Sequence, residues 1–337
     1  MKYLTTLLTT LALSINCNAQ SQDNNLLGAL KDRIEVHGFA QGGYTYQDNS
    51  KPNNSFEMKR VILLARARVT DKWSFLLMHE PVSGKWQEYY TDYRFSKAFG
   101  ARLGQMKTLI TIENPIIPTQ LESISLLSQA ANFLTGTASD PLYGKQIGRD
   151  LGFMVYGDLF KDHLTYELGV FNGQGINVKD GNNQKDFQGK LTVKPVKELS
   201  LVTSFLLGTG HAIATSPFNP DIQAGDNYTR NRWTLGGVLN TKDFYLRAEY
   251  LTGKDGKAKS EGYYATARVP LVNKLDAVAS YDYMNYNKSL GIKQTNYIAG
   301  LQYWFYRDCR LQVQYTRCEP KMGDGYNKLE VQTQISF

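Results

Sequence analysis

The feature of this sequence that most constrains its fold is a two-residue alternation of apolar and polar side chains, which recurs along most of the chain. The last segment shows it most clearly. One side carries Leu329, Val331, Thr333, Ile335 and Phe337, and the other carries Glu330, Gln332, Gln334 and Ser336. Successive side chains of a β-strand point to opposite faces. Each such segment is therefore predicted to be a strand with one apolar face and one face in water.

About sixteen such segments lie between stretches rich in Gly, Asn, Asp and Pro. The predicted strands span 34–46, 55–70, 73–81, 86–96, 100–109, 149–159, 163–172, 184–194, 198–209, 229–241, 242–253, 258–270, 273–285, 292–304, 308–318 and 326–337. The connections 70–72, 160–162 and 270–272 are predicted to be short periplasmic turns, and 173–183, 210–228 and 319–325 are predicted to be external loops. An even count suits a single-chain barrel whose ends meet on one side.

The composition indicates that these strands cross a membrane. After the first residues, no apolar run approaches the ~20 residues that a membrane helix requires. In lipid the backbone must pair within the protein, which leaves helices and closed barrels. The 22 Tyr, 15 Phe and 4 Trp suit strands and interfacial girdles, and a mean hydropathy of −0.40 fits strands with one wet face. We expect an all-β fold, a transmembrane antiparallel β-barrel.

The two ends of the chain favour the outer membrane of a Gram-negative bacterium. Lys2 followed by the apolar stretch 4–15 and by Ala19 is typical of a signal peptide, predicted at 1–19. Residues 20–337 then form one barrel domain. The closing aromatic Phe337 resembles the C-terminal signal by which the barrel-assembly machinery recognises such proteins. The expected surroundings are outer-membrane lipid and lipopolysaccharide.

The connection 110–148 differs from the others, because it is long and contains apolar residues such as Ile116, Leu121 and Phe133. Long loops in compact folds are usually functional. We expect it to fold into the lumen as a constriction loop, with a short helix within 118–133, and its charged residues to include Glu113, Glu122 and Lys145. The alternative is a mobile external loop.

Alternation also assigns charged residues to the lumen. A charge facing lipid near the midplane costs about 2–4 kcal/mol, so Arg60, Arg66 and Arg68 must face water. The candidate anion path consists of Arg60, Arg66, Arg68, Arg94, Arg102, Lys107 and Arg149. Acidic side chains such as Asp92, Glu167 and Glu330 also face inward, so the arginines either select anions or pair with acids to stiffen the wall.

No pattern of a catalytic or metal site is present in the sequence. The four histidines are His37, His79, His163 and His211, and none lies in a nucleophile motif or at ligand spacing. We expect no enzyme activity, no metal and no cofactor. The net charge of +7 is assigned to a cationic lumen or to contacts with acidic headgroups, not to nucleic acid.

Five short motifs resemble the porin O and P family, named for phosphate-selective porins. They are Phe56-Glu57-Met58-Lys59-Arg60, Ala65-Arg66-Ala67-Arg68, Tyr93-Arg94-Phe95, Arg102-Leu103-Gly104-Gln105-Met106-Lys107 and Gly148-Arg149-Asp150-Leu151-Gly152. The resemblance covers most of the mature chain in layout and is sharpest over 55–160. It implies a sixteen-stranded barrel, usually a homotrimer, with an inward-folded third loop and an arginine ladder.

The resemblance implies a porin for passive diffusion of small anionic or polar solutes, with phosphate and other oxyanions as candidates. The chain departs from the family where lysines near the constriction help to hold the anion. Here residues 110–148 contain Lys145 but also Glu113, Glu122 and Asp140. This departure weakens the expectation of phosphate more than that of a porin. The alternative function is an outer-membrane receptor or adhesin barrel without selective transport.

Overall fold

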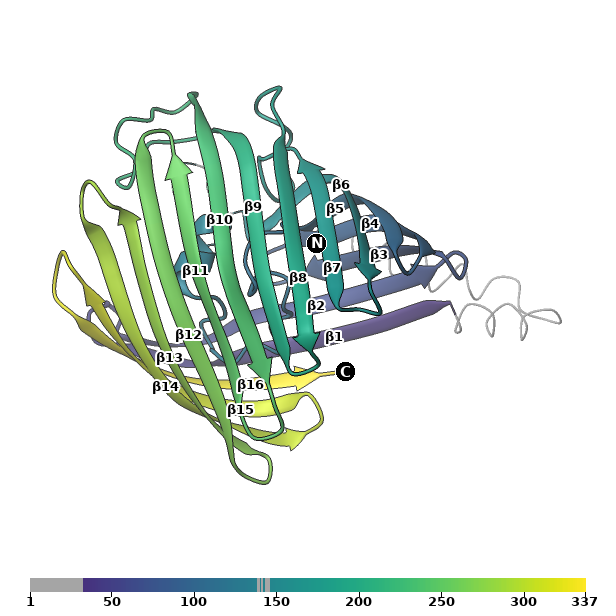
Figure 1. Ribbon diagram of the computed structural model, residues 1–337. Coiled ribbons are helices and arrows are strands. Elements are labelled where there is room, and N and C mark those ends of the chain that lie inside the picture. Colours follow the sequence, from purple (N-terminus) through teal and green to yellow (C-terminus); the bar gives the residue numbers. More distant parts are fainter. Residues whose placement is uncertain (1–32, 138–139, 141, 143–145) are drawn as a thin grey trace, which may run out of the picture.

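The protein is seen in a computed structural model that describes residues 33–137, 140, 142 and 146–337. Within these residues, sixteen strands form one closed antiparallel barrel (Figure 1). Each strand pairs with its sequence neighbours, and β1 pairs with β16 to close the sheet. The predicted fold class is therefore confirmed. The predicted signal peptide at 1–19 lies outside the described residues.

The strand bounds agree with the predicted spans to within three residues. In chain order they are β1 (Ile34–Gln47), β2 (Asn54–Arg68), β3 (Trp73–Glu80), β4 (Lys85–Ser96), β5 (Phe99–Lys107), β6 (Arg149–Leu159), β7 (Leu164–Phe171), β8 (Asp186–Val196), β9 (Leu199–His211), β10 (Asn227–Asn240), β11 (Tyr245–Asp255), β12 (Ala258–Val272), β13 (Leu275–Asn287), β14 (Ile292–Tyr306), β15 (Cys309–Pro320) and β16 (Tyr326–Ser336).

One predicted turn is wrong. Residues 270–272 belong to the end of β12, and the turn consists of residues 273–274. The pairing of β12 with β13 shifts between Pro270 and Val272. Such an irregularity admits a proline, which lacks the N–H that a regular ladder needs, near the end of a strand. A Pro in the sequence therefore marks the irregularity and not the turn itself.

The barrel wall separates apolar from polar side chains as the alternation predicts. On β15, Leu311, Val313 and Tyr315 are exposed on the outside, whereas Arg310 and Gln312 are buried inside. The outer face carries exposed large apolar side chains on strands all around the barrel. Because lipid covers such a face without cost, the barrel presents the apolar band of a membrane-spanning sheet.

The last residue takes part in closing the barrel. Phe337 and Gly38 of β1 exchange two backbone hydrogen bonds of 2.9 Å. A Cβ atom at position 38 would lie 2.4 Å from the Phe337 ring, so glycine lets that ring lie across β1 in the observed position. The start of β1 and the end of β16 therefore lie together, at the end of the barrel that carries the short turns (Figure 1).

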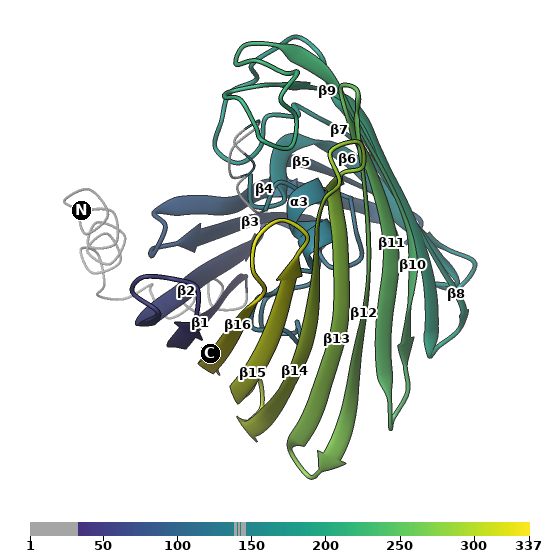
Figure 2. The same cartoon turned by 90° about the vertical axis from the view of Figure 1, so that its left-hand side faces the viewer.

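The two sides of the barrel differ in height, and one long connection enters the interior. Strands β3, β5 and β7 have 8, 9 and 8 residues, whereas β12 and β14 have 15 each. The connection of residues 108–148, here called the lumen loop, follows β5 and carries the short helix α3 (Gln129–Leu134). Figure 2 shows α3 inside the ring of strands. The inward-folded loop and its short helix are thus observed.

In the described part of the chain, no helix has the length and apolar character to span a membrane.

Candidate functional site

A buried ion triad ties the lumen loop to the far wall of the barrel. Arg247 of β11 contacts Glu113 at 3.0 Å and Glu122 at 2.9 Å, and all three side chains are buried. Burial raises the pKa of Glu113, against the opposing effects of Arg247 and of hydrogen bonds from Ser128. Both carboxylates contact the same guanidinium, so one side chain of β11 holds two points of the loop. The predicted loop acids thus hold the loop in place.

The middle of the lumen loop lies on a polar floor formed by β15 and β16. Arg310 donates to the Leu121 carbonyl at 2.6 Å, and Gln312 donates to the Glu122 carbonyl at 3.0 Å. Gln314 accepts from the Ile124 amide at 2.8 Å. These bonds satisfy backbone groups that would otherwise be buried without partners. The inward glutamines of the alternating strands therefore serve the loop and not a solute.

Helix α3 is docked against the tall side of the barrel. Ser128 caps its N-terminus by accepting from the Ala131 amide, and the Gln129 amide donates to Asp282 of β13 at 2.9 Å. The Phe133 ring packs edge-on against Phe218 and Tyr286. Asp282 supplies an acceptor at the start of the helix and the aromatic rings pack near its end, so this buried helix is held at both ends.

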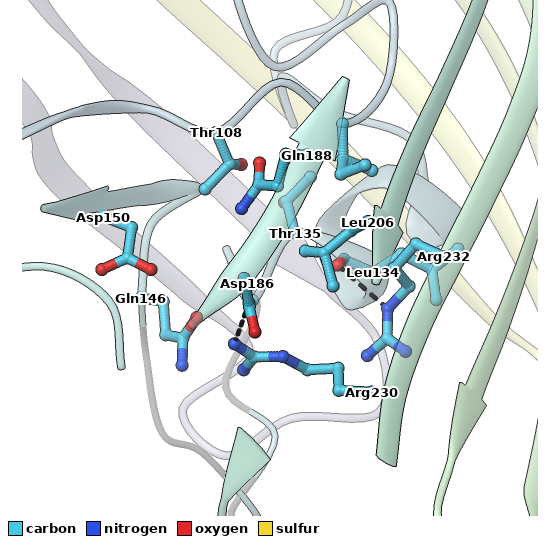
Figure 3. A pocket seen from close by; sticks show the side chains of 12 residues that line it. Thr108, Leu134, Thr135, Gln146, Asp150, Asp186, Gln188, Leu206, Arg230 and Arg232 are labelled. Atoms are coloured by element: carbon cyan, nitrogen blue, oxygen red, sulfur yellow. Dashed lines mark hydrogen bonds and ion pairs between the residues drawn. The ribbon is translucent and has the colours of Figure 1, made fainter. Parts of the chain in front are cut away.

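The junction between the loop and β8–β10 is nearly closed. A cavity there has a volume of only about 20 Å³. Figure 3 shows two contacts in its lining: Asp186 pairs with Arg230, at 2.6 Å, and the Leu134 carbonyl accepts from Arg232, at 3.3 Å. A space of this size holds about one water molecule.

A larger cavity lies on the other side of the loop, against the short strands. Its volume is about 240 Å³, and the loop contributes Pro115 and Ile117 to its lining. The wall contributes inward side chains from β2 to β8. Because the loop covers the opposite wall and several charged side chains line this cavity, we take it as the candidate functional site.

Four cations line this cavity, and their pairing differs. Arg102 contacts Asp92 at 2.9 Å, and Lys190 contacts Glu167 at 2.6 Å. Lys107 donates to the Ile116 carbonyl at 2.9 Å. In the described part of the chain, neither Arg66 nor Lys107 has a carboxylate oxygen within 4 Å, the distance that defines an ion pair here.

The other candidate cations lie elsewhere. Arg60 donates to Gln41 at 2.6 Å, and Arg149 pairs with Glu88 at 3.1 Å. Arg68 pairs with Glu35 and Arg94 pairs with Asp158, both close to the turns that end their strands. Of the predicted anion-path residues, Arg66, Arg102 and Lys107 line the cavity beside the loop.

Lys145, the one lysine predicted within the constriction loop, lies outside the described residues.

Two features of the lumen do not follow from the alternation. A bulge opposite Gln41 inserts one extra residue, so Lys59 as well as Arg60 faces inward, and Lys59 pairs with Glu330 at 2.5 Å. The inward face of β2–β6 is also apolar around the cavity, with Leu64, Leu76 and Met154. The consecutive apolar residues of Phe75–Met78 are the only sequence signal of that second feature.

The described residues contain no group of three or more His, Cys, Asp or Glu side chains placed to hold a metal ion.

Comparison with known proteins places the fold. No family model matches the sequence, and no curated protein matches it. Among solved structures, the chain is similar to an anion-selective porin from Comamonas acidovorans, with 14% identity and a TM-score of 0.69 over 90% of this chain and 99% of that one. The chain has the fold of the outer-membrane porins. This is the barrel type that spans the outer membrane of Gram-negative bacteria.

Two further porin-fold structures give the same result. The trimer form of OmpT, an outer membrane protein of Vibrio cholerae, is 11% identical with a TM-score of 0.66, over 90% of this chain and 99% of that chain. The OmpF of Salmonella typhi in complex with daunomycin is 10% identical with a TM-score of 0.66, over 90% and 97%. At these identities the likeness concerns the fold, and the resemblance to the phosphate-selective family stays a prediction.

Proposed function

We propose that this protein is a channel for passive diffusion of small solutes across the outer membrane and that it prefers anions. The observation that carries the proposal is the pair Arg66 and Lys107, which line the cavity beside the lumen loop without a carboxylate partner in the described chain. Unpaired cations at a narrow point raise the local concentration of anions and repel cations. The paired Arg102 and Lys190 contribute less to this field.

The pairing pattern supports a role for the arginines in the wall and a role in selectivity. Arg149 with Glu88 and Arg94 with Asp158 stiffen the wall, whereas Arg66 and Lys107 line the cavity without an acidic partner among the described residues. The net preference is therefore expected to be moderate. Support from outside the chain comes from the similar fold of a porin whose description calls it anion-selective.

The solute class is proposed as small anions and polar molecules. Phosphate and other oxyanions are included because of the motif resemblance. A guanidinium binds such oxygens through a planar fork, which suits a site that passes an anion along. Neither a catalytic role nor a cofactor enters this proposal.

The proposed assembly is a homotrimer in the outer membrane, in contact with lipid and lipopolysaccharide after insertion by the barrel-assembly machinery. The motif resemblance motivates it, and one structure of similar fold is described as a trimer form. The mass of the purified protein in detergent, about three chains or one chain, decides between trimer and monomer.

The proposed function is tested by the reversal potential of the purified protein in a planar bilayer under a KCl gradient. We expect a sign that corresponds to chloride preference and a current that falls when phosphate is added. A neutral or cation-selective potential would reject the anion preference and keep the channel. A folded protein without any conductance would instead favour a receptor or adhesin barrel.

A further inference from the structure

The cavity beside the lumen loop has a lining that is unusual for a water-filled passage. Its wall presents Leu64, Leu76, Met78 and Met154 from strands β2, β3 and β6, together with Tyr90 of β4. Leu76, Met78, Tyr90 and Met154 belong to one packed apolar cluster, and Leu64 packs against it half-buried. Lumen walls of wide porins are polar because they face water. An apolar surface in such a place is typical of a binding site.

The cations of the same cavity stand beside this apolar surface. Arg66 follows Leu64 on the inward face of β2, and Lys107 ends β5 where the lumen loop begins. The Arg102 guanidinium lies over the Tyr90 ring at 4.2 Å, which extends the flat aromatic surface with a charged one. The cavity thus offers two kinds of contact at once, an apolar surface and basic side chains without an acidic partner among the described residues.

A small inorganic anion uses only one of these contacts. Phosphate is strongly hydrated and loses water without compensation against leucine and methionine side chains. An apolar molecule without charge uses only the other contact. A ligand with an anionic head and an apolar body satisfies both.

The size of the cavity fits such a ligand. Its volume is about 240 Å³. An apolar cavity of about 150 Å³ is enough to bind benzene in a well-studied engineered case. The remaining space accommodates a carboxylate beside the ring.

We propose that this cavity is a binding site for small organic carboxylates with an apolar or aromatic body, which it recognises through Arg66 and Lys107 at the carboxylate and through Leu64, Met78 and Tyr90 at the body. This inference rests on the proposed channel function and names its solute class. It ranks such carboxylates above inorganic phosphate as preferred solutes.

The test is the block of the KCl current through the wild-type protein by four probes. Benzoate carries charge and ring, acetate carries charge only, benzyl alcohol carries a ring only, and phosphate is the inorganic anion. We expect benzoate to reach half-block at a concentration about tenfold below that of each other probe, since burial of an aromatic ring adds to the charge contact. Equal half-block concentrations of benzoate, acetate and phosphate in an anion-selective channel would overturn this inference and leave the proposed channel function intact.

A matched pair of variants locates the site. Leu64→Asn places an amide on the apolar wall and should bring the half-block concentration of benzoate to within about twofold of that of acetate. Val202→Asn makes the same kind of change at an inward position of β9 that does not line the cavity, and should keep the benzoate advantage. Benzoate block unaffected by Leu64→Asn, or lost in Val202→Asn only, would contradict the placement. If Leu64→Asn does not fold, the four-probe series on the wild type still decides.

A wild-type channel that shows no anion selectivity would reject the proposed anion preference, whatever the probe series gives. If benzoate still blocked such a channel, the apolar wall would be supported as a binding site. The role assigned to Arg66 and Lys107 would be rejected. The two failures are thus distinguishable by the reversal potential and the probe series.

Discussion

At the scale of single residues, the effect of a lumen cation depends on its partner. Arg102 lies 2.9 Å from Asp92, and Arg149 lies 3.1 Å from Glu88, so their charges are largely compensated. Arg66 and Lys107 lack such a partner among the described residues. Arg66 and Arg102 look equivalent in the sequence, but the field that each exerts on a passing ion differs, because only Arg102 has an acidic partner in the described part of the chain.

The double variant Arg66→Gln with Lys107→Gln should lower the chloride-to-potassium permeability ratio about threefold or more. A unit charge about 5 Å from an ion in water contributes roughly 0.8 kcal/mol before salt screening, and two charges are removed. Reversal potentials in a KCl gradient measure the ratio. Arg94→Gln is the control, because Arg94 is paired with Asp158 near a turn and should change the ratio far less. Equal effects of both changes would contradict the assignment.

The sequence predicts the facing of most residues and misses what depends on neighbours. A period of two correctly puts Arg60 and Arg66 inside, because a charge cannot face lipid. It fails at Lys59, where the bulge opposite Gln41 shifts the period by one. The period of two also does not say how far a residue lies from the ends of its strand. Arg68 and Arg94 belong to the predicted anion path, but they lie near the turns.

At the scale of elements, the lumen loop is the feature that shapes the interior. Its apolar composition predicts that it folds inward, because those side chains need cover from water. Its anchors cannot be predicted in this way, since Glu113 and Arg247 are 134 residues apart in sequence. Alternation places Arg247 inside but does not identify its partners. The triad can therefore be identified only from the three-dimensional structure.

Arg247→Ala should destabilise the barrel and release the loop. Removal of Arg247 leaves Glu113 and Glu122 buried beside each other without a cation, which typically costs about 3–5 kcal/mol. We expect a lower temperature of the heat-induced gel shift and a larger, noisier single-channel conductance. Arg268→Ala is the control, since Arg268 of β12 stacks on Tyr245 and lies outside the triad. A variant with normal conductance and stability would show that the polar floor alone holds the loop.

At the scale of the whole molecule, the barrel is closed by its own ends and divided by its own loop. The sixteen strands and the closure of β1 on β16 follow from the count and from the final strand. The division of the lumen does not follow in this way. The loop is anchored on β11 and β15, and the cavity lies between the loop and strands β2–β8. This asymmetry brings a few cations and an apolar wall together in one small space.

The central claim is that solutes pass between the lumen loop and strands β2–β8. The most direct measurement is block of the current by a bulky thiol reagent at single cysteines, in a background where Cys17, Cys309 and Cys318 are serine. Arg66→Cys should lose most of its current on modification. Gln312→Cys, on the buried floor beneath the loop, should lose little. The reverse pattern, block at position 312 and none at position 66, would contradict the account.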